Sequence, residues 1–364
     1  MKKLFLCEII CLLLLGCSSF KKYDQTRPEL SVAFTDTENL PSVVLFDEEY
    51  YNENSMIFFV LSDYMQNYSK FAKYNVNSKQ IVKIIFEAKD NERIREYCNA
   101  NGIIVFSVLI KDEFYSHDIY LYNIDSDKLT KINADPLNKS DDVMPLSLKT
   151  DGVGIVYVDQ NFENDTSSIK YYDISNGKIE DISVIPFTDT DIKASIFFSD
   201  INSGTIIYDR INNGKLEIIV YDVNSKTTIS VIEPLEGVAL DYRGLLNKEN
   251  NFIALYSQAQ DGDIIYIHDL KNNKNKRLVS FDQYSMAYND MLYTKNNDIL
   301  YNVQRNVSGN VKDHYYGEVY RLNNYSMEQI FKCFNISIGI KYIAFLKFDD
   351  QGIKTIHFEL YKYM

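Results

Sequence analysis

The chain of 364 residues contains no tryptophan, six prolines and four histidines. The histidines (His117, His268, His314 and His357) each stand alone, so the paired spacing of a zinc-binding helix is missing. No Gly-x-Ser-x-Gly sequence marks the nucleophile turn of a serine hydrolase. We therefore expect no catalytic residue, no metal and no other cofactor.

Positive charge and cysteine are also scarce. The net charge is −13 at pH 7, which does not suit nucleic acid, because phosphates attract Lys and Arg. After residue 17 only Cys98 and Cys333 remain, in the second and sixth of the repeats described below. Cysteines on opposite sides of a ring are too far apart to bond. We expect neither a nucleic-acid partner nor a structural disulfide.

Long hydrophobic runs are missing except at the beginning of the chain. Met1-Lys2-Lys3 is followed by an apolar stretch from Leu4 to Leu15, broken only by Glu8. The stretch is short for a bilayer span and carries the flanks of an export signal. An uncleaved hydrophobic helix is the alternative. Nothing after Leu15 is long and apolar enough to cross a membrane.

The next residues resemble a bacterial lipoprotein signal. Leu14-Leu15-Gly16-Cys17 is similar to a lipobox, and this resemblance implies that residues 1–16 are a removed signal peptide and that Cys17 carries acyl chains such as palmitate. Two or three chains would anchor the protein stably in a membrane. The polar residues 17–28 then form a tether that reaches at most roughly 40 Å. Ser18 after the cysteine implies the outer membrane if the cell is Gram-negative.

The sequence is rich in aromatic residues, which recur with a regular period. It holds 29 Tyr and 21 Phe, a composition typical of half-buried strands. An aromatic-rich strand, an Asn or Asp and a polar turn return at intervals of 47 to 54 residues, at Asn75, Asn123, Asp173, Asp222, Asp269 and Asn323. Such a period indicates an array of small sheets that bury their faces against one another.

Each repeat divides into four strands, and this pattern predicts an all-β propeller over residues 29–364. In the third repeat the strands are expected at 143–148, 152–160, 169–174 and 178–185, separated by Asp-Gly and Asn-Gly turn signals. After the sixth repeat, residues 336–361 supply three strands, and residues 29–35 supply one. Joined together they would make a seventh blade, which favours seven blades; six blades is the alternative. The only stretch with helical leanings is 89–98, which could equally be a loop.

The best repeat resembles that of the propeller domain of the translocation protein TolB. Pro145-Leu146-Ser147-Leu148-Lys149-Thr150-Asp151-Gly152 leads into an apolar strand and an aromatic-rich strand that ends at Asp173. The usual TolB repeat has an aromatic residue and a second Pro that are missing here. The resemblance implies a propeller fold for this chain, but we do not infer from it that the chain shares a binding partner with TolB.

Exposed loops carry the candidate binding residues. The connections between second and third strands lie on one face of a propeller, and here they contain many aspartates, including Asp118, Asp159 and Asp209. We expect a negative face. Its aromatic and basic residues are typical of a protein-binding surface; they are Tyr115, Phe162, Arg210, His314, Tyr315 and Tyr316.

Two functions remain open. The first is a monomeric, lipid-anchored scaffold of the cell envelope that binds a protein or peptide without catalysis. The alternative is a propeller that binds or cleaves carbohydrate, in which aromatic residues stack on sugars and a pair of acids performs hydrolysis.

Overall fold

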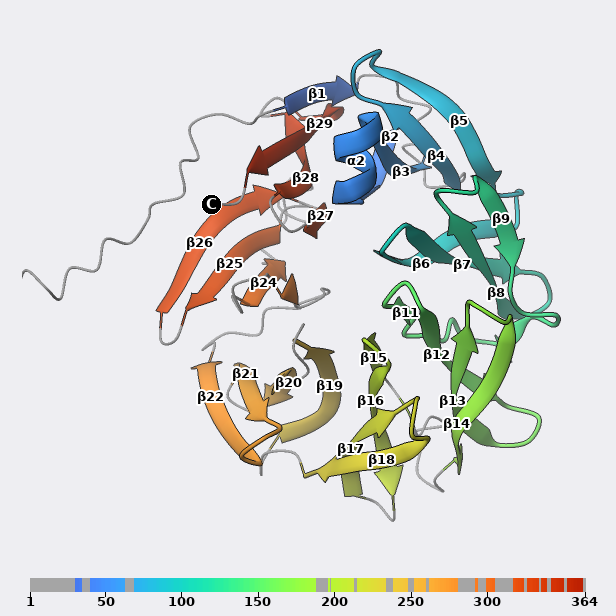
Figure 1. Ribbon diagram of the computed structural model, residues 1–364, viewed down its shortest axis with the longest axis vertical. Helices are drawn as coiled ribbons and strands as arrows, with labels where there is room; N and C mark the ends of the chain where they lie inside the picture. The colour runs from blue at the N-terminus through green and yellow to red at the C-terminus, as the bar shows by residue number, and fades with distance from the viewer. Residues whose placement is uncertain are drawn as a thin grey trace, which may run out of the picture.

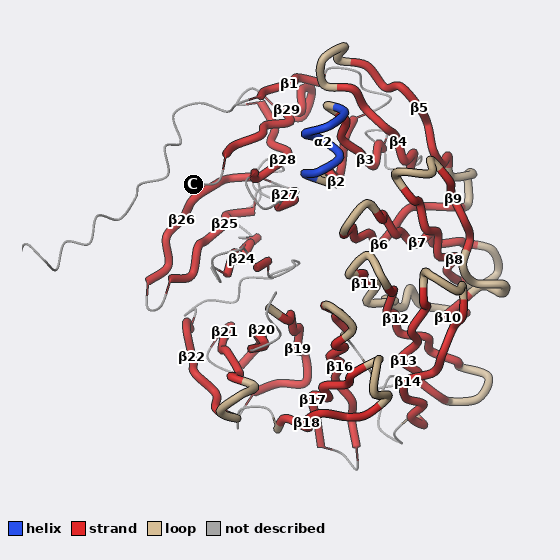
Figure 2. The backbone as a smooth tube through the Cα atoms, in the orientation of Figure 1, coloured by secondary structure: helices blue, strands red, loops and turns tan. Residues whose placement is uncertain are grey.

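The computed structural model describes residues 30–34, 40–62, 69–187, 196, 198–212, 215–233, 238–247, 252–259, 262–280, 292–293, 299–304, 317–323, 326–333, 335–338, 342–349 and 352–362. Small antiparallel sheets are arranged around a centre like the blades of a propeller (Figure 1). Within these residues strands dominate, and a single short helix is present (Figure 2). The predicted all-β propeller is confirmed.

The described strands form seven sheets, six of four strands and one of five. We number six of them in chain order and call the seventh the closing sheet. Sheet 1 contains β2 (Leu40–Leu45), β3 (Met56–Ser62), β4 (Ser69–Asn75) and β5 (Gln80–Glu87). Sheet 2 contains β6 (Glu92–Ala100), β7 (Ile103–Lys111), β8 (Tyr115–Asn123), β9 (Lys128–Lys131) and β10 (Leu137–Ser140). Sheet 3 contains β11 (Lys149–Thr150), β12 (Gly154–Asn161), β13 (Thr166–Asp173) and β14 (Lys178–Pro186).

The remaining sheets follow the same plan. Sheet 4 contains β15 (Ser199–Asn202), β16 (Thr205–Asn212), β17 (Lys215–Asp222) and β18 (Thr227–Ile232). Sheet 5 contains β19 (Val238–Leu246), β20 (Phe252–Ala259), β21 (Gly262–Asp269) and β22 (Lys274–Ser280). Sheet 6 contains β23 (Leu292–Tyr293), β24 (Ile299–Gln304), β25 (Gly317–Asn323) and β26 (Ser326–Cys333). The closing sheet contains β1 (Leu30–Phe34), β27 (Asn335–Ile338), β28 (Tyr342–Asp349) and β29 (Gly352–Lys362).

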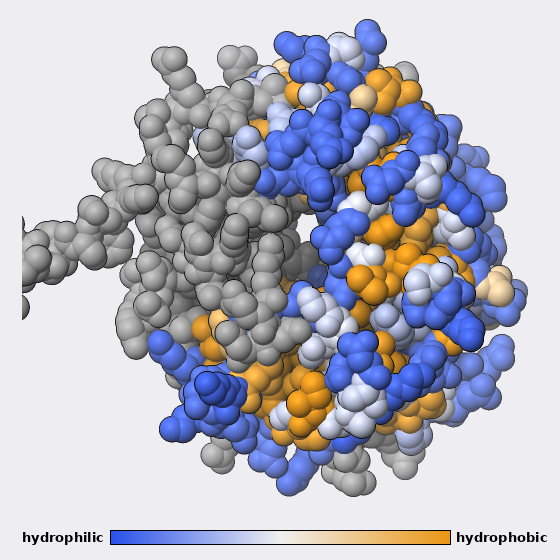
Figure 3. Space-filling view, viewed as in Figure 1, coloured by the Kyte–Doolittle hydropathy of each residue, from blue (hydrophilic) through white to orange (hydrophobic). Residues whose placement is uncertain are grey.

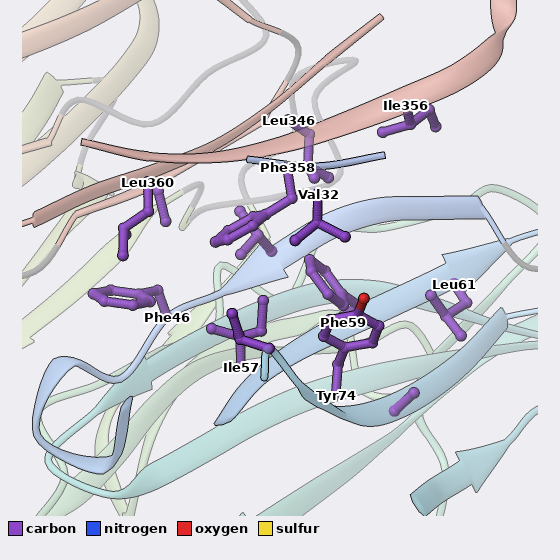
Figure 4. Close-up of a cluster of buried hydrophobic side chains, with 14 residues drawn as sticks. Val32, Phe46, Ile57, Phe59, Leu61, Tyr74, Leu346, Ile356, Phe358 and Leu360 are labelled. Atoms are coloured by element: carbon purple, nitrogen blue, oxygen red, sulfur yellow. The ribbon is translucent and has the colours of Figure 1, made fainter. Parts of the chain in front are cut away.

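The closing sheet joins the two ends of the chain, as the sequence predicted. β1 pairs antiparallel with β29, with Leu30 opposite Leu360 and Phe34 opposite Ile356. The sheet packs on sheet 1 through a buried hydrophobic cluster (Figure 4). In that cluster the fully buried rings of Phe59 and Phe358 meet edge to face, with centroids 5.7 Å apart.

Buried side chains elsewhere also lie between neighbouring sheets. Separate hydrophobic clusters join sheet 1 to sheet 2, sheet 2 to sheet 3, sheet 3 to sheet 4 and sheet 4 to sheet 5. In Figure 3 hydrophobic residues fill the spaces between these sheets, and hydrophilic residues cover much of the described surface. The sheets whose side chains the structure describes are therefore packed against their neighbours, as expected for a repeat array.

The recurring Asn or Asp of the sequence begins the turn between the third and fourth strands. Its side-chain oxygen accepts a backbone N–H from two or three residues further on, and this bond stabilises the tight turn. The bond occurs in five sheets, at Asn75, Asn123, Asp173, Asp222 and Asp269. The Asn or Asp that recurs in the sequence therefore marks the turn between the third and fourth strands of each of these five sheets.

Two segments differ from their prediction. Residues 89–98, expected to form a helix or a loop, contribute to strand β6, because pairing with the buried strand β7 outweighs the helical propensity of Glu and Arg. The expected strand 143–148 is not a strand, and only Lys149–Thr150 pairs with β12. Its backbone N–H groups at Leu146 and Leu148 instead donate to the carboxylate of Glu96, at 2.6 and 2.9 Å.

The helix α2 (Glu48–Asn54) lies between β2 and β3 and was not predicted. Asp47 caps its N-terminus by accepting the N–H of Tyr50. Tyr51 packs against Tyr342 of the closing sheet, with ring centroids 6.1 Å apart. Among the described residues no helix has the length and apolar character needed to span a membrane.

Candidate functional site

One face of the propeller gathers two kinds of connection. The strands of each sheet alternate in direction, so the turn between the second and third strands leaves at the same end as the link to the next sheet. Contacts in sheets 2 and 3 show this: Ser140, on the link after β9, pairs with Tyr115 at the start of β8, and the N–H of Phe187 donates to Asp165 O at 2.7 Å. We call this end the loop face.

Half-buried aromatic rings lie on the loop face of sheets 2 and 3. In sheet 2, Lys111 Nζ lies 5.4 Å from the ring centroid of Tyr115, and Lys139 Nζ lies 5.0 Å from that of Phe114. In sheet 3, the rings of Phe162 and Phe187 pack with centroids 5.4 Å apart. These six residues form what we call the aromatic–lysine surface. It includes two of the predicted binding residues, Tyr115 and Phe162.

Of the other predicted binding residues, the structure describes Arg210 alone. Arg210 lies in β16, where its Nε and a terminal nitrogen both contact Glu217 Oε2 at 2.7 Å across the strand pair. This ion pair engages its guanidinium within sheet 4. His314, Tyr315 and Tyr316 lie outside the described residues, as does Cys17.

Three aspartates that were expected to make the loop face negative are buried or half-buried instead. Asp118 pairs with Lys131 at 2.8 Å, and Asp209 accepts the N–H of Phe198 at 2.8 Å. Asp159 is half-buried and lies 3.5 Å from Lys170. Burial raises the pKa of Asp159, and the nearby Lys170 opposes that rise. All three lie within strands, where neighbouring residues provide their partners.

Asn138 holds the two halves of the aromatic–lysine surface together. Its side chain is 2% exposed, and its φ of 53° is a conformation that Asn tolerates better than most residues. Oδ1 accepts the backbone N–H of Gln160 in sheet 3 at 2.6 Å, while Nδ2 donates to Pro145 O at 3.4 Å. The bond to Gln160 fastens β10 to the neighbouring sheet. No sequence motif marked this residue.

The histidines that the structure describes lie in strands. His268 in β21 is hydrogen-bonded to Asn275 Oδ1 at 2.8 Å, and His357 lies in β29. His117 in β8 is fully buried, and neither ring nitrogen makes a regular hydrogen bond with the described residues. Burial lowers the pKa of His117 to about 4, and the charge of Arg95 contributes to this; the Met144 carbonyl and Asp118 oppose it.

The described part of the chain holds no cluster of three or more His, Cys, Asp or Glu side chains that could bind a metal ion. Cys98 is half-buried in β6 and forms no disulfide with another residue that the structure describes. The described loop face of sheets 2 and 3 presents aromatic rings, lysine side chains over two of those rings and polar turns around them.

Comparison with known proteins identifies the fold. No family model and no curated protein matches the sequence. Among solved structures, the oligogalacturonate lyase of Vibrio parahaemolyticus has a TM-score of 0.57 at 12% identity, over 92% of this chain and 94% of that one. TolB from Acinetobacter baumannii has a TM-score of 0.46 at 13% identity, over 89% and 86%. The β-propeller domain of the Trilobed protease from Pyrococcus furiosus has a TM-score of 0.49 at 13% identity, over 75% and 81%. At these identities the likeness shows fold and no more: this chain is a β-propeller.

Proposed function

We propose that this chain is a monomeric, lipid-anchored scaffold of the bacterial cell envelope that binds a protein partner without catalysis. The observation that carries the proposal is the aromatic–lysine surface. Partly exposed aromatic rings are enriched in protein interfaces, and here they cluster on connections that the Asn138–Gln160 hydrogen bond holds together. The anchor is inferred from the lipobox-like residues that end at Cys17.

The course of the first strand supports an outward orientation of this surface. The end of the strand pair β28–β29 at which Asp349 pairs with Gly352 lies at the loop face, because these are the second and third strands of the closing sheet. Leu30 pairs with Leu360, near the far end of β29. The chain therefore enters the propeller at the face opposite the loop face. A tether from Cys17 would hold that opposite face toward the membrane and present the loop face to a partner.

Lipidation is tested by partition in the detergent Triton X-114. We expect the full-length protein to enter the detergent phase and to incorporate labelled palmitate, because two or three acyl chains bind lipid strongly. Cys17→Ala should move nearly all of the protein to the aqueous phase. Cys98→Ala is the matched control and should partition as the wild type does. If Cys17→Ala stays in the detergent phase and keeps the label, the anchor is not at this cysteine.

Partner binding is tested with a photo-crosslinking amino acid placed at single positions of the full-length protein in native membranes. Tyr115 and Phe162 are the test positions on the loop face. Val153 is the control, because it is 63% exposed but lies on the turn between first and second strands, at the opposite face. We expect an envelope protein to be crosslinked from Tyr115 and Phe162 and not from Val153. Failure to capture any protein from either test position contradicts the scaffold and directs attention to glycan arrays, which test the carbohydrate alternative.

A further inference from the structure

We infer that the partner presents a basic segment, rich in Lys or Arg, to the loop face of sheets 2 and 3. This inference rests on the proposed function and specifies the chemistry of its partner. Two observations point to a ligand that bears cations: the aromatic rings of this surface already have lysines over their faces, and the exposed carboxylates around the rings form no described ion pair. A third observation, that the connections beneath the rings are held in place, favours binding in general.

The rings of this surface accept a positive charge on their faces. Lys111 lies over Tyr115, and Lys139 lies over Phe114. Both lysines are exposed, so a partner can replace or join them without opening the protein. A cation over an aromatic ring is attracted by the electron-rich face of the ring, and the attraction strengthens when water is removed. Phe162 and Phe187 form a second aromatic pair that no described cation covers.

The exposed carboxylates around these rings are not neutralised. Six acidic residues on the connections of this face are exposed, namely Glu113, Asp135, Asp141, Asp142, Glu163 and Asp165. Within the described residues none of them forms an ion pair. The cations nearby are engaged elsewhere, since Lys131 binds buried Asp118 and the two other lysines lie over rings. A basic segment would complement this rim and be steered toward it.

The surface is also held in place before binding. Three of the chain's six prolines are exposed on this face: Pro136 and Pro145 lie on its connections, and Pro186 ends β14. Asn138 binds both sheet 3 and the connection that contains Pro145. Proline has a restricted backbone and the Asn138 bonds fix β10, so little conformational entropy remains to be lost on binding.

The inference is tested by fluorescence anisotropy with two labelled peptides on the full-length protein in detergent. One peptide repeats Lys-Tyr-Ser four times, and the other repeats Glu-Tyr-Ser four times. We expect the lysine peptide to bind at least about tenfold more tightly at low salt, and its affinity to fall steeply as salt screens the rim. Equal affinity for the two peptides would overturn the inference.

Matched variants distinguish this surface from the general acidity of the chain. Asp141→Asn/Asp142→Asn/Glu163→Gln removes three charges from the rim and should weaken binding of the lysine peptide about tenfold. Glu49→Gln/Glu53→Gln/Asp125→Asn removes three exposed charges from the opposite face and should change it less than twofold. An equal loss in both variants would mean general attraction and would also overturn the inference. Photo-crosslinking from Tyr115 would still succeed in that case, so the scaffold and the charge of its partner are tested separately.

Discussion

Between about pH 7 and pH 4 the protein is expected to lose roughly 3 kcal/mol of its unfolding free energy through His117 alone. Unfolded, this imidazole binds a proton near its ordinary pKa of 6.5, whereas burial lowers the pKa in the folded protein to about 4. The unfolded state therefore binds more protons in this interval. The contribution of His117 to the unfolding free energy is fully present above pH 6.5. It falls as the pH drops from 6.5 toward 4, and below pH 4 this group lowers the unfolding free energy no further.

The effect is measured as the urea midpoint of unfolding by circular dichroism across this pH range. The neutral variant His117→Leu removes the proton site and places an apolar side chain on the same face of β8 as Ile119 and Leu121. Its stability should depend less on pH between 7 and 4, by roughly the amount attributed to His117. Other groups titrate in both proteins, so the difference between the two curves is the result that matters. Parallel curves would show that His117 does not titrate as its burial requires.

Truncation of Phe358 in the closing sheet is expected to destabilise the protein by about 3–5 kcal/mol, the usual cost of removing a fully buried ring. Phe358 contacts Phe59 of sheet 1, and both side chains have 0% exposure (Figure 4). Because this contact joins the two ends of the chain, Phe358→Ala should also loosen the ring where it closes. We expect faster amide hydrogen exchange in β1 and β29.

The matched control is Phe106→Ala. Phe106 is also fully buried and lies between sheets 1 and 2, where its ring contacts Phe71 at 5.2 Å between centroids. The Phe106→Ala variant should lower the unfolding free energy by a similar amount, but amide hydrogen exchange should become faster in β4 and β7. If both variants accelerate exchange in the same strands, the closing sheet does not open independently. If Phe358→Ala leaves β1 protected, the contact does not hold the ring closed.

Local sequence signals predicted the repeated elements well, and the reason is that the signals act over a few residues. Asp173 needs only the backbone N–H two residues away to form its turn, and the alternating strands on either side pair with their immediate neighbours. The union of β1 with the C-terminal strands also followed from the sequence, because one strand at one end and three at the other each lacked a sheet.

Sequence reasoning failed where a residue's environment comes from neighbouring strands. Asp118 and Asp159 looked like loop carboxylates, yet each lies within a strand and pairs with a lysine of an adjacent strand, Lys131 or Lys170. Residues 92–100 are polar and helix-prone, but β7 provides an edge with which they pair. Tyr115 and Phe162 were recognised as aromatic residues on loops, whereas their connection through Asn138 was not visible.

The sequence by itself determined that this is a ring of small antiparallel sheets, because the period, the turn residues and the aromatic strands are encoded within each repeat. The tertiary structure alone decided which polar residues are exposed and which are buried. That choice depends on the packing of adjacent sheets, which brings together residues some fifty positions apart, such as Glu96 and Leu146. A hydrogen bond between adjacent sheets, from the N–H of Gln160 to Asn138, likewise connects the loops of sheets 2 and 3 into one surface.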